Sequence, residues 1–130
     1  MSEDSHIKIT KEAMSKAYVP YSNYPVGVLI ITDTGNQYIG CNVENASYPL
    51  GNCAEASAIS SMVIGGESKI NKIYVMTIND DGGIPCGGCR QRIREFSDKS
   101  TEVIMCSPDG IKDRINLSKL LPQSFGPEHL

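Results

Sequence analysis

The hydrophobic and polar positions in the first half of the chain predict a helix, two strands and a second helix. Residues 6–18 carry apolar side chains at helical spacing, and residues 19–25, which include two prolines, break that spacing. Two strand-like runs follow, Val26–Thr32 and Gln37–Val43, and the short polar segment between them indicates a hairpin. The mostly apolar residues from Cys53 to Ile64 stop at two glycines, which is typical of a buried helix.

In the second half of the chain, strand-like and helix-like segments alternate. Ile70–Ile78 and Glu102–Cys106 are expected to be strands. The polar segment from Pro85 to about Phe96 is expected to be a helix, and Leu117–Leu121 a short one. This alternation implies parallel crossovers, whereas the first hairpin is antiparallel. We therefore expect a single domain over residues 1–130 of the α/β class, a three-layer α/β/α structure with a mixed central sheet.

Charge and hydropathy argue against two classes of partner. The chain has 12 basic and 15 acidic residues and a net charge of -3, so it lacks the positive surface that binds a phosphate backbone. Its longest apolar stretch, Val26–Ile31, is far shorter than the roughly 20 residues that span a bilayer. The N-terminus is acidic, unlike a secretory signal. We expect a cytoplasmic protein that binds neither nucleic acid nor a membrane.

The chain contains five cysteines, an odd number. In a reducing compartment they remain free for metal binding or catalysis rather than forming a disulfide framework. Cys41 and Cys106 lie inside apolar runs and are expected to be small core residues. The remaining three, Cys53, Cys86 and Cys89, belong to motifs with recognisable spacing.

Two motifs, each at the beginning of a predicted helix, carry the candidate chemistry. They are Asn52-Cys53-Ala54-Glu55 and Pro85-Cys86-Gly87-Gly88-Cys89. A Cys-x-x-Cys pair alone fits a redox motif or half of a structural zinc site. A zinc ligand two positions before a glutamate, followed by Pro-Cys-x-x-Cys, is typical of zinc base deaminases, here with three cysteine ligands.

The spacing suits one metal ion bound by three thiolates. Cys86 and Cys89 are three positions apart at a helix start, so both sulfurs can face one point, and Cys53 can reach it from the other helix. A structural zinc ion normally has four protein ligands, and no fourth is evident, so the open position is expected to hold water. Glu55 can then move protons from that water to ring N3 and to the departing amine. The alternative for Glu55 is a solvated carboxylate in the first helical turn.

The sequence resembles the short form of the cytidine deaminase family, nearly from end to end. Besides the zinc motifs, the resemblance rests on residues 19–27, 40–48 and 120–127. It implies a cytidine deaminase-like fold and one Zn²⁺ per chain. It also implies hydrolytic deamination of cytidine and deoxycytidine to uridine and deoxyuridine, with release of ammonia, in pyrimidine salvage.

By this resemblance, five residues of the chain bind the nucleoside. Asn42 and Glu44 hydrogen-bond the ribose 3′-hydroxyl, the Ala54 backbone and Glu55 hold the base edge, and Tyr24 lines the base pocket. Asn42 and Glu44 also have the same parity on a predicted strand, so both side chains project to one face. An exposed polar strand end would show the same pattern.

The family also implies a homotetramer in which active sites are shared. Tyr48 and Phe125 would reach a neighbouring subunit's site, with Phe125 lying against the base. Phe125 lies in a tail of Pro, Gly and Ser without an obvious local core, which suits an intersubunit contact. The alternative is that it packs on its own domain.

Two positions depart from the family pattern. Ala56 stands where the family often has arginine, whose charge would offset that of three thiolates. The two helix N-termini and Arg90, next to Cys89, are the candidates to replace it. Tyr24 stands where phenylalanine is more usual, and its hydroxyl needs a hydrogen-bond partner or access to water.

Other functions fit the sequence less well. A deaminase of another aminopyrimidine, such as blasticidin S, shares the zinc motifs but not the sugar-binding and C-terminal segments. Nucleotide substrates would need a glycine-rich phosphate loop or a basic cluster, and a nucleic-acid editor would need a cationic groove. A binding module would use zinc only to fold, a possibility that replacement of Glu55 would test.

Overall fold

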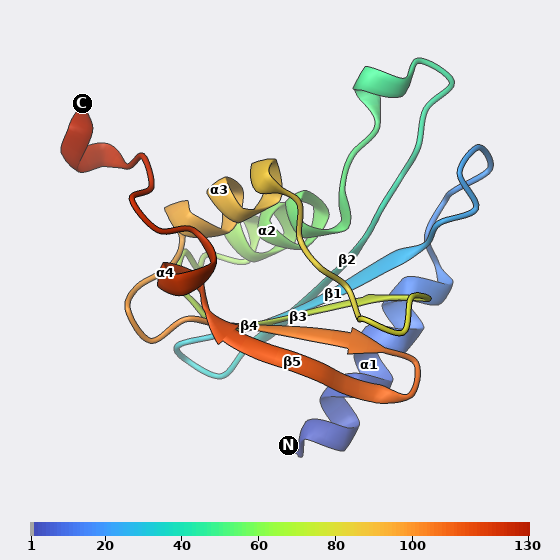
Figure 1. Cartoon of the computed structure of the whole chain (residues 1–130), viewed down its shortest axis with the longest axis horizontal. Coiled ribbons are helices and arrows are strands. Elements are labelled where there is room, and N and C mark those ends of the chain that lie inside the picture. The colour runs from blue at the N-terminus through green and yellow to red at the C-terminus, as the bar shows by residue number, and fades with distance from the viewer. Residues whose placement is uncertain (1) are drawn as a thin grey trace.

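The computed structural model describes residues 2–130, which form a five-stranded sheet with helices on both faces (Figure 1). The helices are α1 (Glu3–Ser15), α2 (Ala54–Ile64), α3 (Gly87–Glu95) and α4 (Leu117–Leu120), and short 3-10 turns span Tyr48–Leu50 and Pro127–His129. The strands are β1 (Val26–Thr32), β2 (Gln37–Cys41), β3 (Ile70–Thr77), β4 (Glu102–Ser107) and β5 (Gly110–Asn116). No helix within residues 2–130 has the length and hydropathy to cross a bilayer.

The strands lie in the order β2-β1-β3-β4-β5. β1 pairs antiparallel with β2 and β3, β3 pairs parallel with β4, and β5 is antiparallel to β4. The connections from β2 to β3 and from β3 to β4 join strands of the same direction, and they contain α2 and α3 as crossover helices. The expected α/β class with a mixed central sheet is therefore confirmed.

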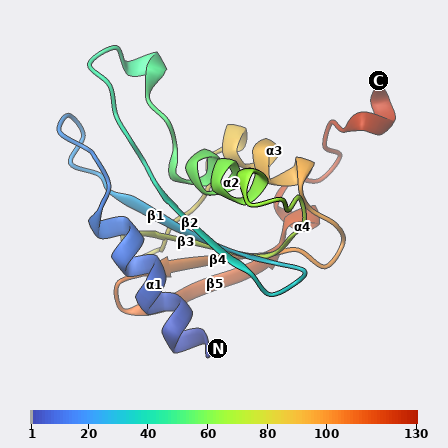
Figure 2. The same cartoon turned by 180° about the vertical axis from the view of Figure 1, so that it is seen from behind.

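The central strands are buried on both faces, which divides the core in two. On β1, Val28 and Ile30 pack under α2 and α3, whereas Leu29 and Ile31 pack under α1. Successive residues of a strand point to opposite faces, so one continuous apolar run supplies both halves of the core. Figures 1 and 2 show α1 on one side of the sheet and α2 and α3 on the other. The three-layer prediction is thus correct.

The hydrophobic pattern did not predict β5. This edge strand exposes three consecutive charged residues, Lys112, Asp113 and Arg114, and such charges are common on sheet edges because they discourage further pairing. Its register also shifts, since Cys106 pairs with Ile111 but Met105 pairs with Asp113. The resulting bulge turns Ile111 toward the α1 side and Ile115 toward the α2 side, so the alternation expected of a strand is lost.

Smaller differences from the sequence predictions concern element ends. α1 begins at Glu3 rather than at residue 6, because the Ser2 hydroxyl caps it by accepting from the backbone N–H of Ser5. β2 ends at Cys41, and Val43 instead forms isolated bridges with Tyr18 and Asn52. Cys106 is buried, as expected, whereas Cys41 is only half-buried.

A close backbone contact seats α2 on the sheet. A Cβ atom at Gly40 of β2 would lie 2.4 Å from the Ala58 nitrogen and 2.6 Å from the Ala54 oxygen. Only glycine allows this approach, because any side chain would meet backbone atoms that cannot rotate away. The contact fixes the first turn of α2, which carries the candidate catalytic residues.

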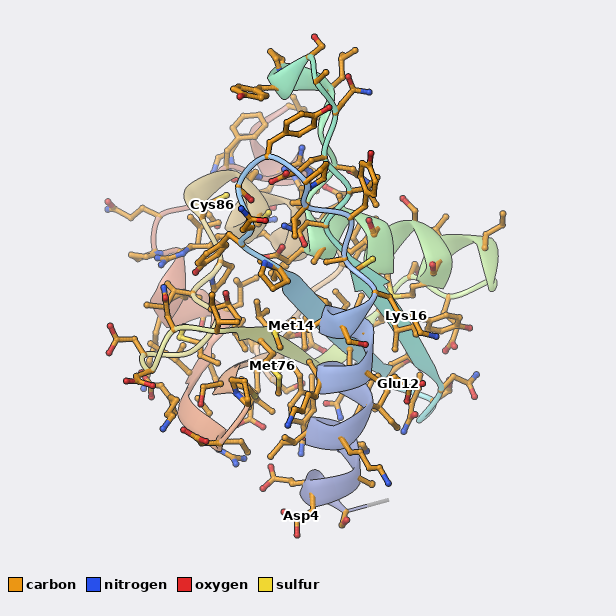
Figure 3. The ribbon with its side chains drawn as sticks, turned by 90° about the vertical axis from the view of Figure 1, so that its right-hand side faces the viewer. Asp4, Glu12, Met14, Lys16, Met76 and Cys86 are labelled. Carbon is orange, nitrogen blue, oxygen red and sulfur yellow. The ribbon has the colours of Figure 1, made fainter. Side chains whose placement is uncertain are left out.

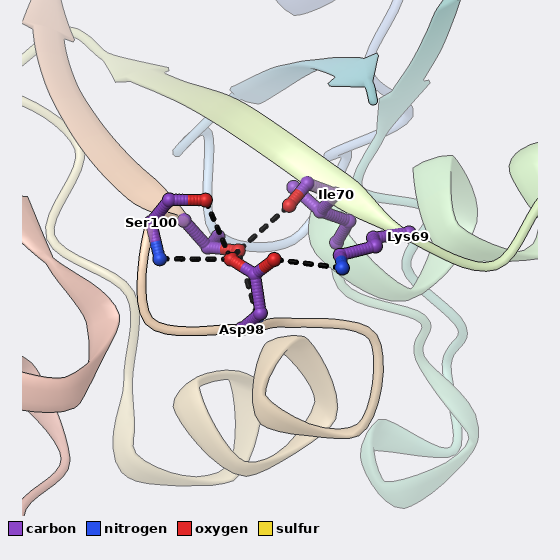
Figure 4. Close-up of polar contacts among 5 residues, drawn as sticks. Lys69, Ile70, Asp98 and Ser100 are labelled. Carbon is purple, nitrogen blue, oxygen red and sulfur yellow. Dashed lines mark hydrogen bonds and ion pairs between the residues drawn. The ribbon is translucent and has the colours of Figure 1, made fainter. Parts of the chain in front are cut away.

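The loop after α3 is tied to the beginning of β3 by a polar network (Figure 4). Asp98 forms an ion pair with Lys69 at 2.8 Å and accepts from the Ser100 backbone N–H at 2.8 Å. The Thr101 hydroxyl donates to the Ile70 carbonyl at 2.7 Å. The Lys69 ammonium and the Ser100 hydrogen bonds hold the pKa of the Asp98 carboxyl below its usual range. The network thereby anchors the C-terminal end of α3 to the sheet.

Candidate metal centre and active site

Two helix starts meet at the candidate metal centre. Cys53 is the N-cap of α2, Cys86 is the N-cap of α3, and Cys89 lies in the first turn of α3. The Cys53 sulfur accepts from the Ala56 backbone N–H at 3.4 Å. Helix N-termini carry partial positive charge, which favours the thiolate form of cysteines placed there. Each predicted ligand therefore occupies the position on its helix that the motif spacing implied.

Two of the predicted ligands are in direct contact. The Cys89 thiol donates to the Cys53 sulfur at 3.0 Å. The potential ligand atoms of Cys53, Cys89 and Glu55 all lie within 4.8 Å of one another. Cys86 lies at the beginning of α3 (Figure 3) and lines the same cavity, but it is exposed and stands outside this close group. The structure thus brings the three cysteines to one cavity, with Cys86 at its outer side.

The chemistry of these donors fits a zinc ion. The hydrogen bond from Cys89 holds the pKa of Cys53 below that of a free thiol, against the effect of burial, and so favours its thiolate form. Thiolates are the soft ligands that zinc prefers. A redox Cys-x-x-Cys site needs only its two motif cysteines, whereas Cys89 also contacts Cys53 on the other helix, so a third thiol joins the pair. This arrangement favours metal binding over the redox alternative.

Glu55 is not the solvated residue of the alternative interpretation. Its side chain is only 4% exposed and lines the cavity beside the cysteines. Burial raises the pKa of the Glu55 carboxyl, and the nearby charge of Cys53 raises it further. A buried carboxyl with a raised pKa beside a cavity is suited to accept and release protons.

The cavity itself has a volume of about 170 Å³. It is bounded by β1, β3, both helix starts and the segment before α3, and its lining residues are Tyr24, Val26, Cys53, Glu55, Val75, Thr77, Gly83, Ile84, Cys86 and Cys89. The predicted base-pocket residue Tyr24 is among them. Ala54 is buried directly beside Glu55 in the first turn of α2.

Asn42 and Glu44, the predicted ribose ligands, both hold the loop that precedes β1. Asn42 Oδ1 accepts from the Val26 N–H at 2.9 Å, and its Nδ2 donates to the Tyr24 carbonyl at 2.9 Å. The Glu44 carboxylate accepts from the Tyr21 N–H at 3.0 Å and from the backbone and hydroxyl of Ser22. These bonds hold the pKa of Glu44 below its usual range, chiefly through the Ser22 hydroxyl.

Glu44 lines a second cavity rather than the one beside the cysteines. This second cavity has a volume of about 290 Å³, and its lining residues are Tyr21, Ser22, Glu44, Asn45, Tyr48 and Gly51. Tyr48 is 75% exposed, and its ring lies 6.0 Å from that of Tyr21. Within one chain, Glu44 and Tyr48 are therefore close to each other but are not brought to the candidate metal centre.

Phe125 also lies outside the cysteine cavity of its own chain. Its ring is 57% exposed and stacks on His129 at 5.7 Å. The tail that carries it is attached to α3, because Gln91 donates to the Phe125 carbonyl and Arg94 donates to the Ser124 hydroxyl, both at 2.9 Å. The tail is thus fixed to the helix that begins at Cys86, while the aromatic ring remains accessible.

Arg90, the candidate to balance the thiolate charge, donates to the Pro85 and Leu120 carbonyls and so supports loops. Two other residues near the site, Arg92 and Asn79, were not singled out in the sequence. The charge of Arg92 helps to lower the pKa of Cys53. Arg92 lies three positions after Cys89 on the same helix, and this spacing could have indicated that its side chain lies near the site. Asn79 donates to the Tyr24 hydroxyl at 3.0 Å, a contact between distant segments for which the sequence holds no signal.

Comparison with known proteins relates these residues to one family. Residues 1–106 match the family model described as the cytidine and deoxycytidylate deaminase zinc-binding region. A cytidine deaminase of Sporosarcina psychrophila is 37% identical over 130 residues, which cover 100% of this chain and 96% of that protein. A cytidine deaminase of Mycoplasma genitalium is 36% identical over 120 residues, covering 92% of each chain.

A solved structure gives the same result at the level of the fold. The crystal structure of cytidine deaminase from Burkholderia pseudomallei matches with a TM-score of 0.89 at 37% identity. The match covers 96% of this chain and 100% of that one. The fold of this chain therefore agrees with that of a cytidine deaminase.

Proposed function

Because this chain belongs to the cytidine deaminase family and is a hydrolytic deaminase, we propose that it binds one zinc ion through Cys53, Cys86 and Cys89. With this ion it converts cytidine and deoxycytidine to uridine and deoxyuridine, releasing ammonia. The proposal rests on one observation, that Cys53, Cys89 and a buried Glu55 lie close together at two helix starts. When bound, zinc supplies a Lewis acid that makes water nucleophilic at neutral pH.

Proton transfer is assigned to Glu55. Its carboxylate accepts a proton from the attacking water, delivers it to ring N3, and then helps to protonate the departing amine. Its raised pKa, caused chiefly by burial, brings the protonated and ionised forms of the carboxyl closer in energy near neutral pH. The backbone of Ala54, in the same helical turn, would hold the edge of the base.

The nucleoside would be oriented by residues around the loop before β1. Tyr24 lines the cavity and would flank the base. A carboxylate has about four acceptor sites and an amide oxygen two, so Glu44 and Asn42 keep capacity for a ribose hydroxyl beside their bonds to the loop. This capacity supports their proposed role in binding the 3′-hydroxyl.

The substrate class is tested by comparing four compounds under the same conditions: cytidine, deoxycytidine, cytidine 5′-monophosphate and blasticidin S. We expect deamination of the two nucleosides with the highest kcat/KM. The nucleotide is expected to react poorly, because a phosphate desolvated without a cationic partner is costly. Faster turnover of the nucleotide or of blasticidin S would refute the assignment to free cytosine nucleosides.

We further propose that residues 1–130 form a single domain and that the protein is a cytoplasmic enzyme of pyrimidine salvage. All five strands belong to one sheet, which supports a single domain. All five cysteines are free, and the proposed ligands must stay reduced to bind metal, a condition that the cytoplasm maintains. Deamination of free nucleosides is the type of reaction that salvage requires.

Shared active sites in a homotetramer are part of the proposal. Tyr48, Leu50 and Phe125 are 75%, 70% and 57% exposed, and Figures 1 and 2 show their segments projecting from the layered body of the chain. The cysteine cavity, about 170 Å³, is smaller than the roughly 300–1,000 Å³ typical of ligand sites. Aromatic side chains from neighbouring subunits would supply the missing walls.

Mixing two impaired variants tests whether sites are shared. Glu55→Ala chains lack the proton carrier, and Phe125→Ala chains lack the aromatic wall that they would give to a neighbour. After reversible dissociation and mixing, hybrids are expected to recover activity, because some sites pair an intact Glu55 with an intact Phe125 from another chain. Each variant mixed with itself sets the baseline. Confirmed hybrids without recovery would refute the sharing of sites through Phe125.

A further inference from the structure

The Tyr24 ring is held at its tip by a residue from a distant segment. Asn79 follows the end of β3, and its Nδ2 atom donates to the Tyr24 hydroxyl at 3.0 Å. Tyr24 lines the cavity beside Cys53 and Glu55, whereas Asn79 does not. Asn79 is therefore expected to act on a bound nucleoside through the tyrosine.

The backbone of Tyr24 is fixed independently of this bond. Its carbonyl accepts from Asn42 Nδ2 at 2.9 Å, and its N–H donates to the Ser22 hydroxyl at 3.0 Å. The next carbonyl, that of Pro25, accepts from the Thr77 hydroxyl at 3.2 Å. With the backbone fixed, the position of the ring depends on its side-chain torsions alone.

Packing does not determine those torsions by itself. Tyr24 is 39% exposed, so the surrounding side chains leave part of the ring uncovered. A hydrogen bond at the hydroxyl, the atom farthest from the backbone, selects one ring orientation among the staggered alternatives. A phenylalanine at this position could not form this bond and would have to be positioned by packing.

We propose that Asn79 is a positioning residue that holds the Tyr24 ring against the base of the substrate. The inference rests on the proposed deamination of nucleosides, because the ring acts on the bound base. Asn79 removes the cost of ordering the ring at the moment of binding. It therefore acts on substrate affinity and leaves the proton transfers at Glu55 unchanged.

The test compares cytidine kinetics of wild type, Asn79→Ala, Tyr24→Phe and the double variant. Asn79→Ala is expected to raise KM about threefold to tenfold, the effect of losing one ordinary hydrogen bond, with kcat within about twofold and zinc content unchanged. In the Tyr24→Phe background, Asn79→Ala is expected to have no further effect, because the bond is already absent. Asn79→Asp should retain the wild-type KM, since the tyrosine hydroxyl can donate to the carboxylate.

Asp80→Ala, a change to the exposed neighbour in the same turn, serves as the control and should leave KM unchanged. Two results would overturn the inference: an unchanged KM in Asn79→Ala, or an equal rise in KM with and without the Tyr24 hydroxyl. Wild-type protein that is loaded with zinc and does not deaminate any cytosine nucleoside would overturn the proposed function, and this inference with it.

Discussion

Glu55→Gln is expected to lower kcat for cytidine by roughly 10²–10⁴-fold, the usual contribution of a positioned general acid and base. Glutamine has nearly the same shape but cannot carry a proton, so the loss reports proton transfer rather than packing. Glu55 is the candidate because it is buried at the cavity, with its pKa raised by that burial. Steady-state kinetics together with zinc analysis of the same preparation would measure the effect.

The matched control for this substitution is Glu95→Gln, at the exposed end of α3, which should keep wild-type kcat. Glu55→Gln is expected to retain one zinc ion per chain, since the thiolates hold the metal. Retained zinc together with a kcat within tenfold of wild type would exclude Glu55 as the proton carrier. Loss of zinc from this variant would instead make Glu55 a metal ligand.

Cys86→Ala is expected to lose zinc and, with it, activity. Cys86 lies outside the close group formed by Cys53, Glu55 and Cys89. Its replacement therefore tests whether the most exposed of the three proposed ligands is needed for zinc binding. Changes beside a metal ligand typically cost about 10–100-fold in affinity, so loss of a ligand should cost more. Competition with a chelator measures the affinity, and metal analysis measures the stoichiometry.

The thermal stability of wild type and of each variant should follow its affinity for zinc. Zinc at 1,000 times its dissociation constant stabilises a protein that binds it only when folded by about 4 kcal/mol. Added zinc should therefore raise the melting temperature of wild type but not of Cys86→Ala. Cys41→Ala, which removes the half-buried cysteine of β2, is the control and should keep its zinc. Stoichiometric zinc in Cys86→Ala would refute the proposed ligand set.

The sequence predicts best the elements whose side chains follow one regular period. β1 is a continuous apolar run because both of its faces are buried, and α2 is apolar because it packs on the sheet beside α3. β5 could not be predicted from the sequence because its bulge at Lys112 turns Ile111 and Ile115 to opposite faces of the sheet. A change of register depends on the partner strand, which local periodicity does not contain.

At the candidate site, too, features with a local sequence signal could be predicted, whereas contacts between distant segments could not. Cys53, Cys86 and Cys89 could be located because each occupies a fixed position relative to a helix start, and helix starts have sequence signals. The contacts of Asn42 with the loop before β1, and of Asn79 with Tyr24, join segments far apart in the chain. Such contacts depend on how the elements pack, so only the structure could reveal them.

The central claim is that this chain deaminates cytidine with a zinc ion held by its cysteines. The most direct measurement follows the ultraviolet absorbance of cytidine on addition of the purified wild-type protein, first as prepared, then after chelation, and then after zinc is restored. We predict a loss of cytidine absorbance that chelation abolishes and one equivalent of zinc per chain restores. Undiminished deamination by protein shown to contain no zinc, or no deamination by fully zinc-loaded protein, would contradict the claim.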